Sequence, residues 1–362
     1  MCCVLVSSGG CSAPLQYAMN EKTKFRVQTP VGVSDEAVRG EGLAQGSLEG
    51  ALVSSVNLDS GVRDYFKKSK NEVCYLSLQL GPLLYQDDIS RLASSVEDAQ
   101  SGNNRLEMIA ETKLLDYNLS KSGFLVVGKK KAVQNLQIKL KESPLMFCGE
   151  EMSQEKSIKY LGDHISAEGL AESVKVTVNK RFGLANRAIS DIRAVIDDCR
   201  SHVCGGIVTG LTIWESAVLP GLLYNAECWI NISNGVLQQL EQLQLRFYRS
   251  LLAVGSGCPI PMLYWDTGGL QMKYCVLKKK LLFLHHLATL PDDSLAKECF
   301  ELQRQQRLPG LYLECEDTLK KNGLLNLSDF TKFQWKNRVR KLCHKLNQEE
   351  LLDKMKSYKK LT

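Results

Sequence analysis

The sequence predicts an α+β N-terminal part followed by an all-α part, and three observations support this fold class. Short β-rich runs lie before about residue 165, at 25–27, 78–80 and 124–128. From about residue 166 the apolar residues recur at helical spacing to the end of the chain. The chain has 362 residues, 44% of them hydrophobic, which is enough to form two or three units with apolar cores.

A helix is predicted between the second and third β-rich runs. The residues from Ser95 to Asp98 have the spacing of a capping box, which marks the start of a helix. The inward-facing residues are Ala99, Leu106, Ile109 and Leu114. The order strand, helix, strand is typical of an α+β unit. After it, residues 144–148 and 157–165 predict a hairpin whose strands are joined through Gly149 and polar residues.

Two amphipathic helices dominate the second part of the chain. The apolar face of the first carries Leu170, Val174, Val178, Ile189, Ile192 and Ile196, with Lys175, Lys180, Arg181, Arg187 and Arg193 around it. The second carries Leu237, Leu240, Leu243, Phe247 and Leu251. Breaks at Pro220, 255–261 and 309–310 predict six or seven helices in all. His285 or His286 lies in an apolar run, and we expect at least one of them to be a hydrogen-bonded core histidine.

Positive charge gathers at the C-terminal end. The whole chain has 46 Lys and Arg against 40 Asp and Glu, a formal net charge of +6. Residues 332–362 alone contain ten Lys or Arg and three acids, a net charge of about +7. This composition is typical either of a solvated helix face or of a surface that contacts nucleic-acid phosphates.

The distribution of the cysteines and the length of the apolar runs indicate the cellular compartment. Thirteen cysteines are scattered from Cys2 to Cys343 without a regular framework, which favours a reducing environment. The first residues lack the basic region of a signal peptide, and no run approaches the ~20 apolar residues that cross a bilayer. We therefore expect an intracellular protein, in the nucleus or cytoplasm, with no membrane partner.

The motif with the clearest chemical meaning is an aspartate pair in a turn. In residues 83–89 an apolar strand runs into Asp87 and Asp88 and then returns to apolar residues. Adjacent aspartates repel each other, and a divalent cation relieves this repulsion. Mg²⁺ prefers one or two carboxylates together with phosphates and water, which suits phosphoryl transfer. An aspartate pair in a turn is also common as a purely structural feature.

Four motifs, in order along the chain, resemble the reverse transcriptase of non-LTR retrotransposons. Residues 85–88, Tyr-Gln-Asp-Asp, resemble the aromatic-x-Asp-Asp motif of the palm. Residues 39–47 resemble the upstream Gln-Gly motif, and 118–122 resemble the palm motif that follows the aspartates. Residues 159–162, Lys-Tyr-Leu-Gly, resemble the primer-grip hairpin. The resemblance covers about residues 15–360 and implies an RNA-directed DNA polymerase that uses Mg²⁺, an RNA template and a DNA primer.

The resemblance also implies roles for single residues and regions. The catalytic and Mg²⁺-binding residues would be Asp87 and Asp88. The template- and nucleotide-binding residues would be Gln45, Gly46, Tyr85 and Lys121. The primer grip would be Tyr160, Leu161 and Gly162. The corresponding regions are 1–14, an unassigned N-terminal segment; 15–165, a partial palm of β-hairpins with packed helices; 166–255, a helical thumb-like region; and 256–362, a basic helical extension.

A second metal-binding strand is missing from this pattern. In the family, a further catalytic aspartate lies on a strand several dozen residues before the Gln-Gly motif, and the fingers also lie upstream. Only 44 residues precede Gln45, and Asp35, in a polar turn, is the single aspartate among them. Two-metal transfer needs carboxylates on both sides of the ions. We therefore expect an N-terminally truncated reverse transcriptase whose palm has an unpaired sheet edge, binds Mg²⁺ weakly or not at all, and does not polymerise.

Other interpretations remain open at this point. The basic helices also fit a non-catalytic module that binds RNA–DNA duplexes, and the helical part fits a protein-interaction module. The chain also fits part of a larger polyprotein whose start lies further upstream. A zinc site is a weaker alternative, since the spacing of Cys199, His202, Cys204 and Cys228 is not that of a usual zinc finger.

Overall fold

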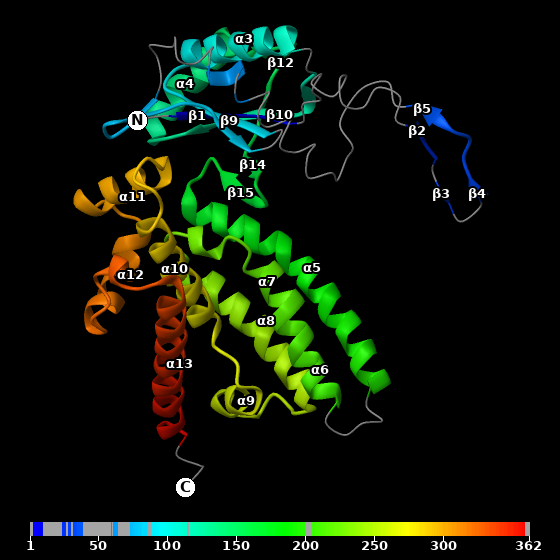
Figure 1. Cartoon of the computed structure of the whole chain (residues 1–362), viewed down its shortest axis with the longest axis vertical. Helices are drawn as coiled ribbons and strands as arrows, with labels where there is room; N and C mark the ends of the chain where they lie inside the picture. Colours follow the sequence, from blue (N-terminus) through cyan, green and yellow to red (C-terminus); the bar gives the residue numbers. More distant parts are fainter. Residues whose placement is uncertain are drawn as a thin grey trace. The chain divides into compact units, whose positions relative to one another are not determined.

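The computed structural model describes residues 3–9, 24–26, 28–29, 32–38, 59, 61–63, 73–85, 88–113, 116–199 and 205–358. The chain divides into two compact units. The sheet unit consists of Met1–Tyr160 and Ile165–Gly169, and the helical unit of Leu161–His164 and Leu170–Thr362 (Figure 1). Each unit is described below on its own.

A five-stranded sheet forms the centre of the sheet unit. In spatial order its strands are β13 (Ser153–Gln154), β10 (Asn118–Val127), β1 (Cys3–Gly9), β9 (Asp88–Ala93) and β8 (Leu83–Tyr85). Strand β1 is antiparallel to both neighbours, with Leu5 opposite Leu92 on one side and Leu125 on the other. Strand β1 comes from residues 1–14, the N-terminal segment that the sequence left unassigned, and it gives β9 a neighbour on each side.

Two helices cover one face of this sheet. They are α3 (Val96–Lys113) and α4 (Lys130–Glu142), and Figure 1 shows both on the same side of the strands. The core between them and the sheet contains Ile89, Ala93, Val96, Ala99, Leu106, Ile109, Phe124, Val126 and Leu140. The predicted start of α3 is confirmed, since the Asp98 amide donates to Ser95 Oγ at 3.1 Å. The predicted inward residues Ala99, Leu106 and Ile109 are buried, whereas Leu114 lies outside the described residues.

Small two-stranded pairs complete the described strands, and residues 161–164 of the last pair belong to the helical unit. They are β2 (Lys24–Phe25) with β5 (Ala37–Val38), β3 (Gln28–Thr29) with β4 (Gly32–Val33), β6 (Val73–Tyr75) with β7 (Leu78–Leu80), β11 (Met146–Phe147) with β12 (Glu150–Glu151), and β14 (Ser157–Tyr160) with β15 (Asp163–Ser166). The predicted hairpin between residues 144–148 and 157–165 is wrong. Each segment instead closes its own hairpin through a local turn, because the left-handed Cys148 and Gly149 reverse the chain immediately after β11.

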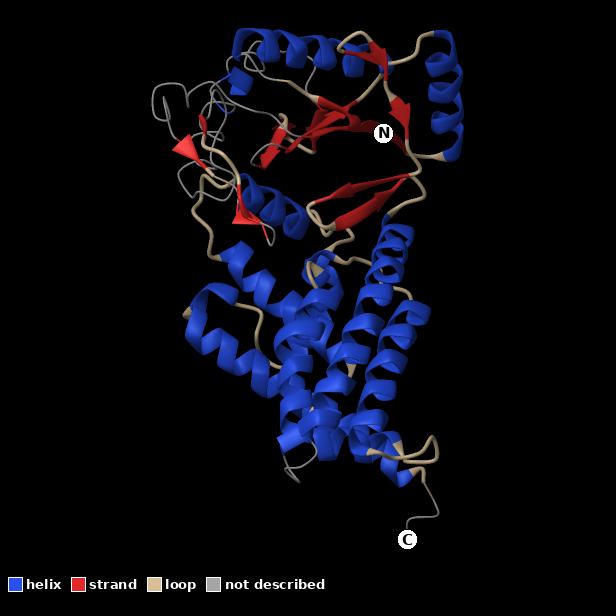
Figure 2. Ribbon diagram, turned by 90° about the vertical axis from the view of Figure 1, so that its right-hand side faces the viewer, coloured by secondary structure: helices blue, strands red, loops and turns tan. Residues whose placement is uncertain are grey.

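The described residues of the helical unit form nine α-helices, not six or seven. They are α5 (Leu170–Cys199), α6 (Gly205–Ile213), α7 (Leu219–Leu222), α8 (Asn234–Leu252), α9 (Ile260–Thr267), α10 (Met272–Ala288), α11 (Leu295–Gln305), α12 (Leu311–Lys321) and α13 (Lys332–Lys356). Three short segments lie between them: the π-helical η2 (Trp214–Val218) and the 3₁₀ turns η3 (Ala226–Cys228) and η4 (Leu327–Asp329). The helices are blue in Figure 2.

A single core runs through the helical unit from Val174 to Leu351. The predicted apolar faces of α5 and α8 supply much of it, although Leu170 is 60% exposed at the start of α5. The prediction of a core histidine is confirmed. His285 is buried, its Nε2 lies 2.8 Å from the Phe330 carbonyl oxygen, and its ring stacks on Trp335.

Candidate functional site

The predicted aspartate turn joins two strands of the central sheet. Strands β8 and β9 are antiparallel, and Tyr85 pairs with Asp88 at the end of the hairpin. Two residues therefore close the turn, Gln86 and Asp87, and both lie outside the described residues. Tyr85 is 53% exposed, whereas Asp88 is half-buried as the first residue of β9.

The two faces of β9 have different surroundings. Ile89 and Ala93 belong to the core under the helices. Since side chains alternate along a strand, Asp88 and Ser90 lie on the face that α3 and α4 do not cover. Ser90 is 1% exposed, and its hydroxyl has no hydrogen-bond partner among the residues that the structure describes. Asp88 therefore lies on the face of the sheet without helices, next to the covered Ser90.

An ion pair fixes β9 to the start of α3. The buried Arg91 guanidinium lies 2.5 Å from Asp98 Oδ1 and also donates to the Asp98 carbonyl oxygen at 2.8 Å. Asp98 Oδ2 accepts from the Ser94 amide at 3.0 Å. Gly102 makes room for the guanidinium, since a Cβ there would lie 2.1 Å from Arg91 Nη1. This pair holds the strand that carries Asp88 in one register against its helix.

Sequence reasoning overlooked this pair, although a signal was present. Arg91 occupies an inward position of β9, between the apolar inward residues Ile89 and Ala93. A charge in such a position needs an opposite charge nearby. Asp98, seven residues further on and beyond a turn, is the nearest acid with the right reach.

Strand β1 lies directly beside the aspartate strand. Ser7 pairs with Ser90 and Ser8 with Ile89, so continuing the register by one residue sets Gly9 opposite Asp88. The seven residues of β1, Cys-Val-Leu-Val-Ser-Ser-Gly, include no Asp or Glu. Asp35, the other carboxylate considered, is exposed between β4 and β5 and belongs to neither neighbour of β9. Among the described strands of this sheet, the position opposite Asp88 therefore has no acidic residue.

Lys121 lies at the same end of the sheet as Asp88. It belongs to the first half of β10, where the pairing with β1 shifts between Ser7 and Gly9, and it is exposed. Gly9 pairs with Asn118 of β10 and continues the register toward Asp88, so the starts of β9 and β10 meet at the end of β1. The predicted residues Gln45 and Gly46 lie outside the described residues.

The predicted primer-grip residues form the end of the β14–β15 hairpin. Tyr160 ends β14, and the turn residues Leu161 and Gly162 both have a left-handed backbone, with φ of 46° and 85°. Two left-handed central residues give the tight turn that suits the twist of a hairpin. A side chain at Gly162 would meet the Tyr224 ring at 2.9 Å.

Helix α5 fixes this turn through Arg181. The guanidinium donates to the carbonyl oxygens of Gly162, at 2.8 Å, and Tyr224, at 2.5 Å, and lies 2.5 Å from Asp163 Oδ1. It also lies over the rings of Tyr224 and Trp229, 5.5 and 5.6 Å from their centres. These contacts make the turn a rigid extension of the helical unit.

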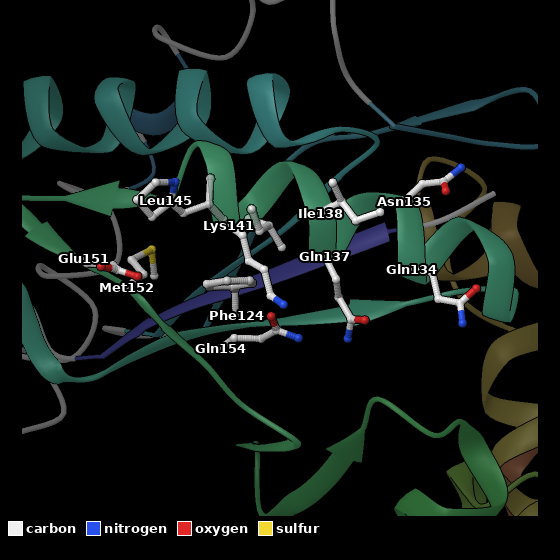
Figure 3. Close-up of a pocket in the computed structure, with 12 residues that line it drawn as sticks. Phe124, Gln134, Asn135, Gln137, Ile138, Lys141, Leu145, Glu151, Met152 and Gln154 are labelled. Carbon is white, nitrogen blue, oxygen red and sulfur yellow. The ribbon is translucent and has the colours of Figure 1, made fainter.

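A hollow of the sheet unit lies on the other face from Asp88. It measures about 980 Å³ and lies between α4 and the edge strand β13. Figure 3 shows Gln137 and Lys141 of α4 reaching toward Phe124 and Gln154. Because Phe124 belongs to the core under the helices, this hollow is separate from the aspartate turn.

Potential metal ligands do not cluster in the described part of the chain. No group of three or more His, Cys, Asp or Glu side chains able to hold a metal ion occurs among these residues. Of the zinc candidates, His202 and Cys204 lie outside them, and so does the side chain of Cys199. None of the helices that the structure describes is both long and apolar enough to span a bilayer.

Comparison with known proteins gives no assignment. No protein-family model matches the chain, and no curated protein matches it significantly. The site is therefore interpreted from its own residues.

Proposed function

We propose that the chain is a reverse transcriptase-like protein that binds RNA–DNA duplexes and does not polymerise by itself. The observation that carries the proposal is the sheet order β8, β9, β1, β10, in which the aspartate turn adjoins a strand that has no acidic residue. An Asp-Asp turn between two strands of a sheet that carries helices on one face supports a polymerase-like origin. The missing carboxylate supports the loss of two-metal chemistry.

Binding of a metal ion here depends on which side chains lie at the same end of the sheet as Asp88. Asp87 and Asp88 would hold a Mg²⁺ ion from one side, with phosphate oxygens and water as further ligands. Phosphoryl transfer by two ions needs a second strand with a carboxylate to bridge them. Glycine in the register position opposite Asp88 offers no ligand oxygen from a side chain.

Helix α13 is our candidate for the phosphate-contacting surface. From Lys332 to Lys345 it contains six Lys or Arg residues and no Asp or Glu. All six are exposed: Lys332, Lys336, Arg338, Arg340, Lys341 and Lys345. In the described part of the chain, Lys332, Lys336 and Lys341 form no ion pair. Free cations on one helix are what a nucleic-acid backbone requires.

A salt series of duplex binding tests the proposal. We expect fluorescence anisotropy with a labelled RNA–DNA hybrid to give a slope of log Kobs against log salt of about −3 or steeper. Replacing Lys332, Lys336 and Lys341 together by Gln should reduce that slope by about 2 to 3, one unit for each lost phosphate contact. The matched control replaces Lys129, Lys130 and Lys131 by Gln, an equal charge change at an exposed site of the sheet unit.

Two results would contradict the proposal. One is the absence of hybrid binding at low salt, which would favour a protein-interaction module. The other is an unchanged slope in the α13 variant combined with a reduced slope in the control. The second result would show that the duplex contacts the sheet unit and not α13.

A further inference from the structure

The helical unit contains a cavity of about 440 Å³ that is separate from the aspartate turn and from the β14–β15 turn. Its walls come from η2 and α7, from α8, from α10, and from α13, together with the loop after α9. This volume lies in the range of pockets that bind small molecules, roughly 300–1,000 Å³.

The inner wall of the cavity is aromatic. Trp214 and Tyr248, which are 0% and 2% exposed, both line it. Trp214 stacks on Phe247 with ring centres 4.7 Å apart, and Tyr248 meets the edge of Trp214 at 6.3 Å. The indole N–H of Trp214 has no hydrogen-bond partner among the described residues, although such groups are nearly always paired when buried.

A π-helical turn sets the position of Trp214. Segment η2 begins at this residue, and Pro220 follows in the first turn of α7. Proline has no N–H for the carbonyl one turn earlier, and its ring would collide with that carbonyl in a regular helix. The wider π turn relieves the collision, and such turns occur frequently at functional sites.

The outer part of the cavity carries positive charge. Lys278 and Lys279 line it from α10, and Arg340 and His344 line it from α13, one turn apart. Lys279 is neutralised by Glu227 at 3.0 Å, whereas Lys278 and Arg340 form no ion pair within the described residues. Burial and the charges of Arg340 and Lys278 lower the pKa of His344, and Glu215 opposes this shift.

Only one carboxylate, Glu215, is among the described residues that line the cavity. Burial raises the pKa of the Cys275 thiol on the wall to about 12, so this group is a neutral apolar surface near pH 7. The cavity thus combines an unpaired donor on an aromatic inner wall with unpaired cations further out. An anion at Lys278 and Arg340 would be held by charge-assisted hydrogen bonds.

We propose that this cavity binds a small molecule in which a phosphate group is attached to a flat aromatic ring. The phosphate lies against Lys278 and Arg340, and the ring lies against the aromatic wall with an acceptor atom toward Trp214 Nε1. The inference stands on the helical unit alone and does not depend on the duplex-binding function.

Calorimetric titration with three probes tests the proposal at ~150 mM salt, where surface charges are screened. The probes are adenosine monophosphate, adenosine and inorganic phosphate. We expect the monophosphate to bind at least about tenfold more tightly than either part alone, because both ends of the cavity are then occupied.

Single substitutions identify the contacts. Arg340→Gln and Lys278→Gln should each weaken the monophosphate by about five- to tenfold and leave adenosine unchanged. Trp214→Phe keeps a ring but removes the donor, and we expect about a threefold loss for both the monophosphate and adenosine. Lys345→Gln is the matched control, because it removes one charge from α13 outside the cavity.

Three outcomes would overturn the proposal. The first is no binding of the monophosphate at millimolar concentration by a folded chain. The second is an affinity for inorganic phosphate equal to that for the monophosphate, because binding would then need only the two cations and not the aromatic wall. The third is an equal loss in Lys345→Gln and Arg340→Gln, since that would reflect net charge rather than the cavity. Circular dichroism of each variant checks that it is folded.

Discussion

At the scale of single residues, the aspartate strand depends on one glycine. Arg91 and Asp98 form a buried ion pair that needs the space above Gly102. Breaking a buried pair is strongly destabilising, because the remaining charge has no partner. The glycine is thus retained by packing, despite its low preference for a helix interior.

Gly102→Ala should therefore destabilise the protein. The new methyl group would push the Arg91 guanidinium away from Asp98, and we expect a loss of about 2 kcal/mol or more in the free energy of unfolding. Gly183→Ala is the control, since this helical glycine of α5 has open space around its Cβ position. The control should gain about 0.5–1 kcal/mol from helix preference. Urea titrations measure both, and a stable Gly102→Ala variant would refute the packing argument.

Residue patterns also show where prediction from sequence stops. The aspartate hairpin and the buried His285 follow from local alternation and composition, whereas Lys121, expected ahead of the strand at Phe124, lies within β10. The turn at Leu161 was found as a motif, but its attachment to Arg181 was not. That contact joins residues nearly twenty positions apart. From the sequence alone, Arg181 is expected only as one of the positive charges around the apolar face of its helix.

At the scale of elements, strand β1 decides the architecture of the sheet. It pairs with β9 and β10, which follow about 80 and 110 residues later, so no local pattern indicates its partners. Helix α3 follows from its capping signal and its apolar period, and α8 follows from its apolar period, since these patterns lie within a few turns. The π turn at η2 and the separate hairpins at β11–β12 and β14–β15 were missed, since they result from a single proline and from left-handed turn residues.

A proline in β1 tests this role of the strand. Leu5 pairs on both sides, and Leu5→Pro removes an N–H and bends the central strand. We expect hydrogen exchange to show at least about a hundredfold loss of protection for the amides of β9 and β10, equivalent to local opening of the sheet. The amides of α10 should stay protected, which serves as an internal control. Unchanged protection of β9 would show that β1 is not part of the native sheet.

At the scale of the whole molecule, the chain has two hydrophobic cores, and the proposed metal site draws its carboxylates from the aspartate turn alone. The sheet unit holds the aspartate turn, and the helical unit holds the exposed cations of α13 and the cavity with the aromatic inner wall. The net charge of +6 thus hides an uneven distribution, since residues 332–362 carry about +7. Binding of a polyanion requires only the cations, whereas polymerisation requires two carboxylate-bearing strands.

Primer extension tests this separation of binding from chemistry most directly. The intact chain is incubated with an RNA template, a DNA primer, the nucleoside triphosphates and either Mg²⁺ or Mn²⁺, at a salt concentration at which the hybrid is bound. The account predicts bound hybrid and no primer extension with either metal. Robust extension that Asp87→Ala abolishes would contradict it, because the aspartate turn would then support catalysis without a carboxylate on β1.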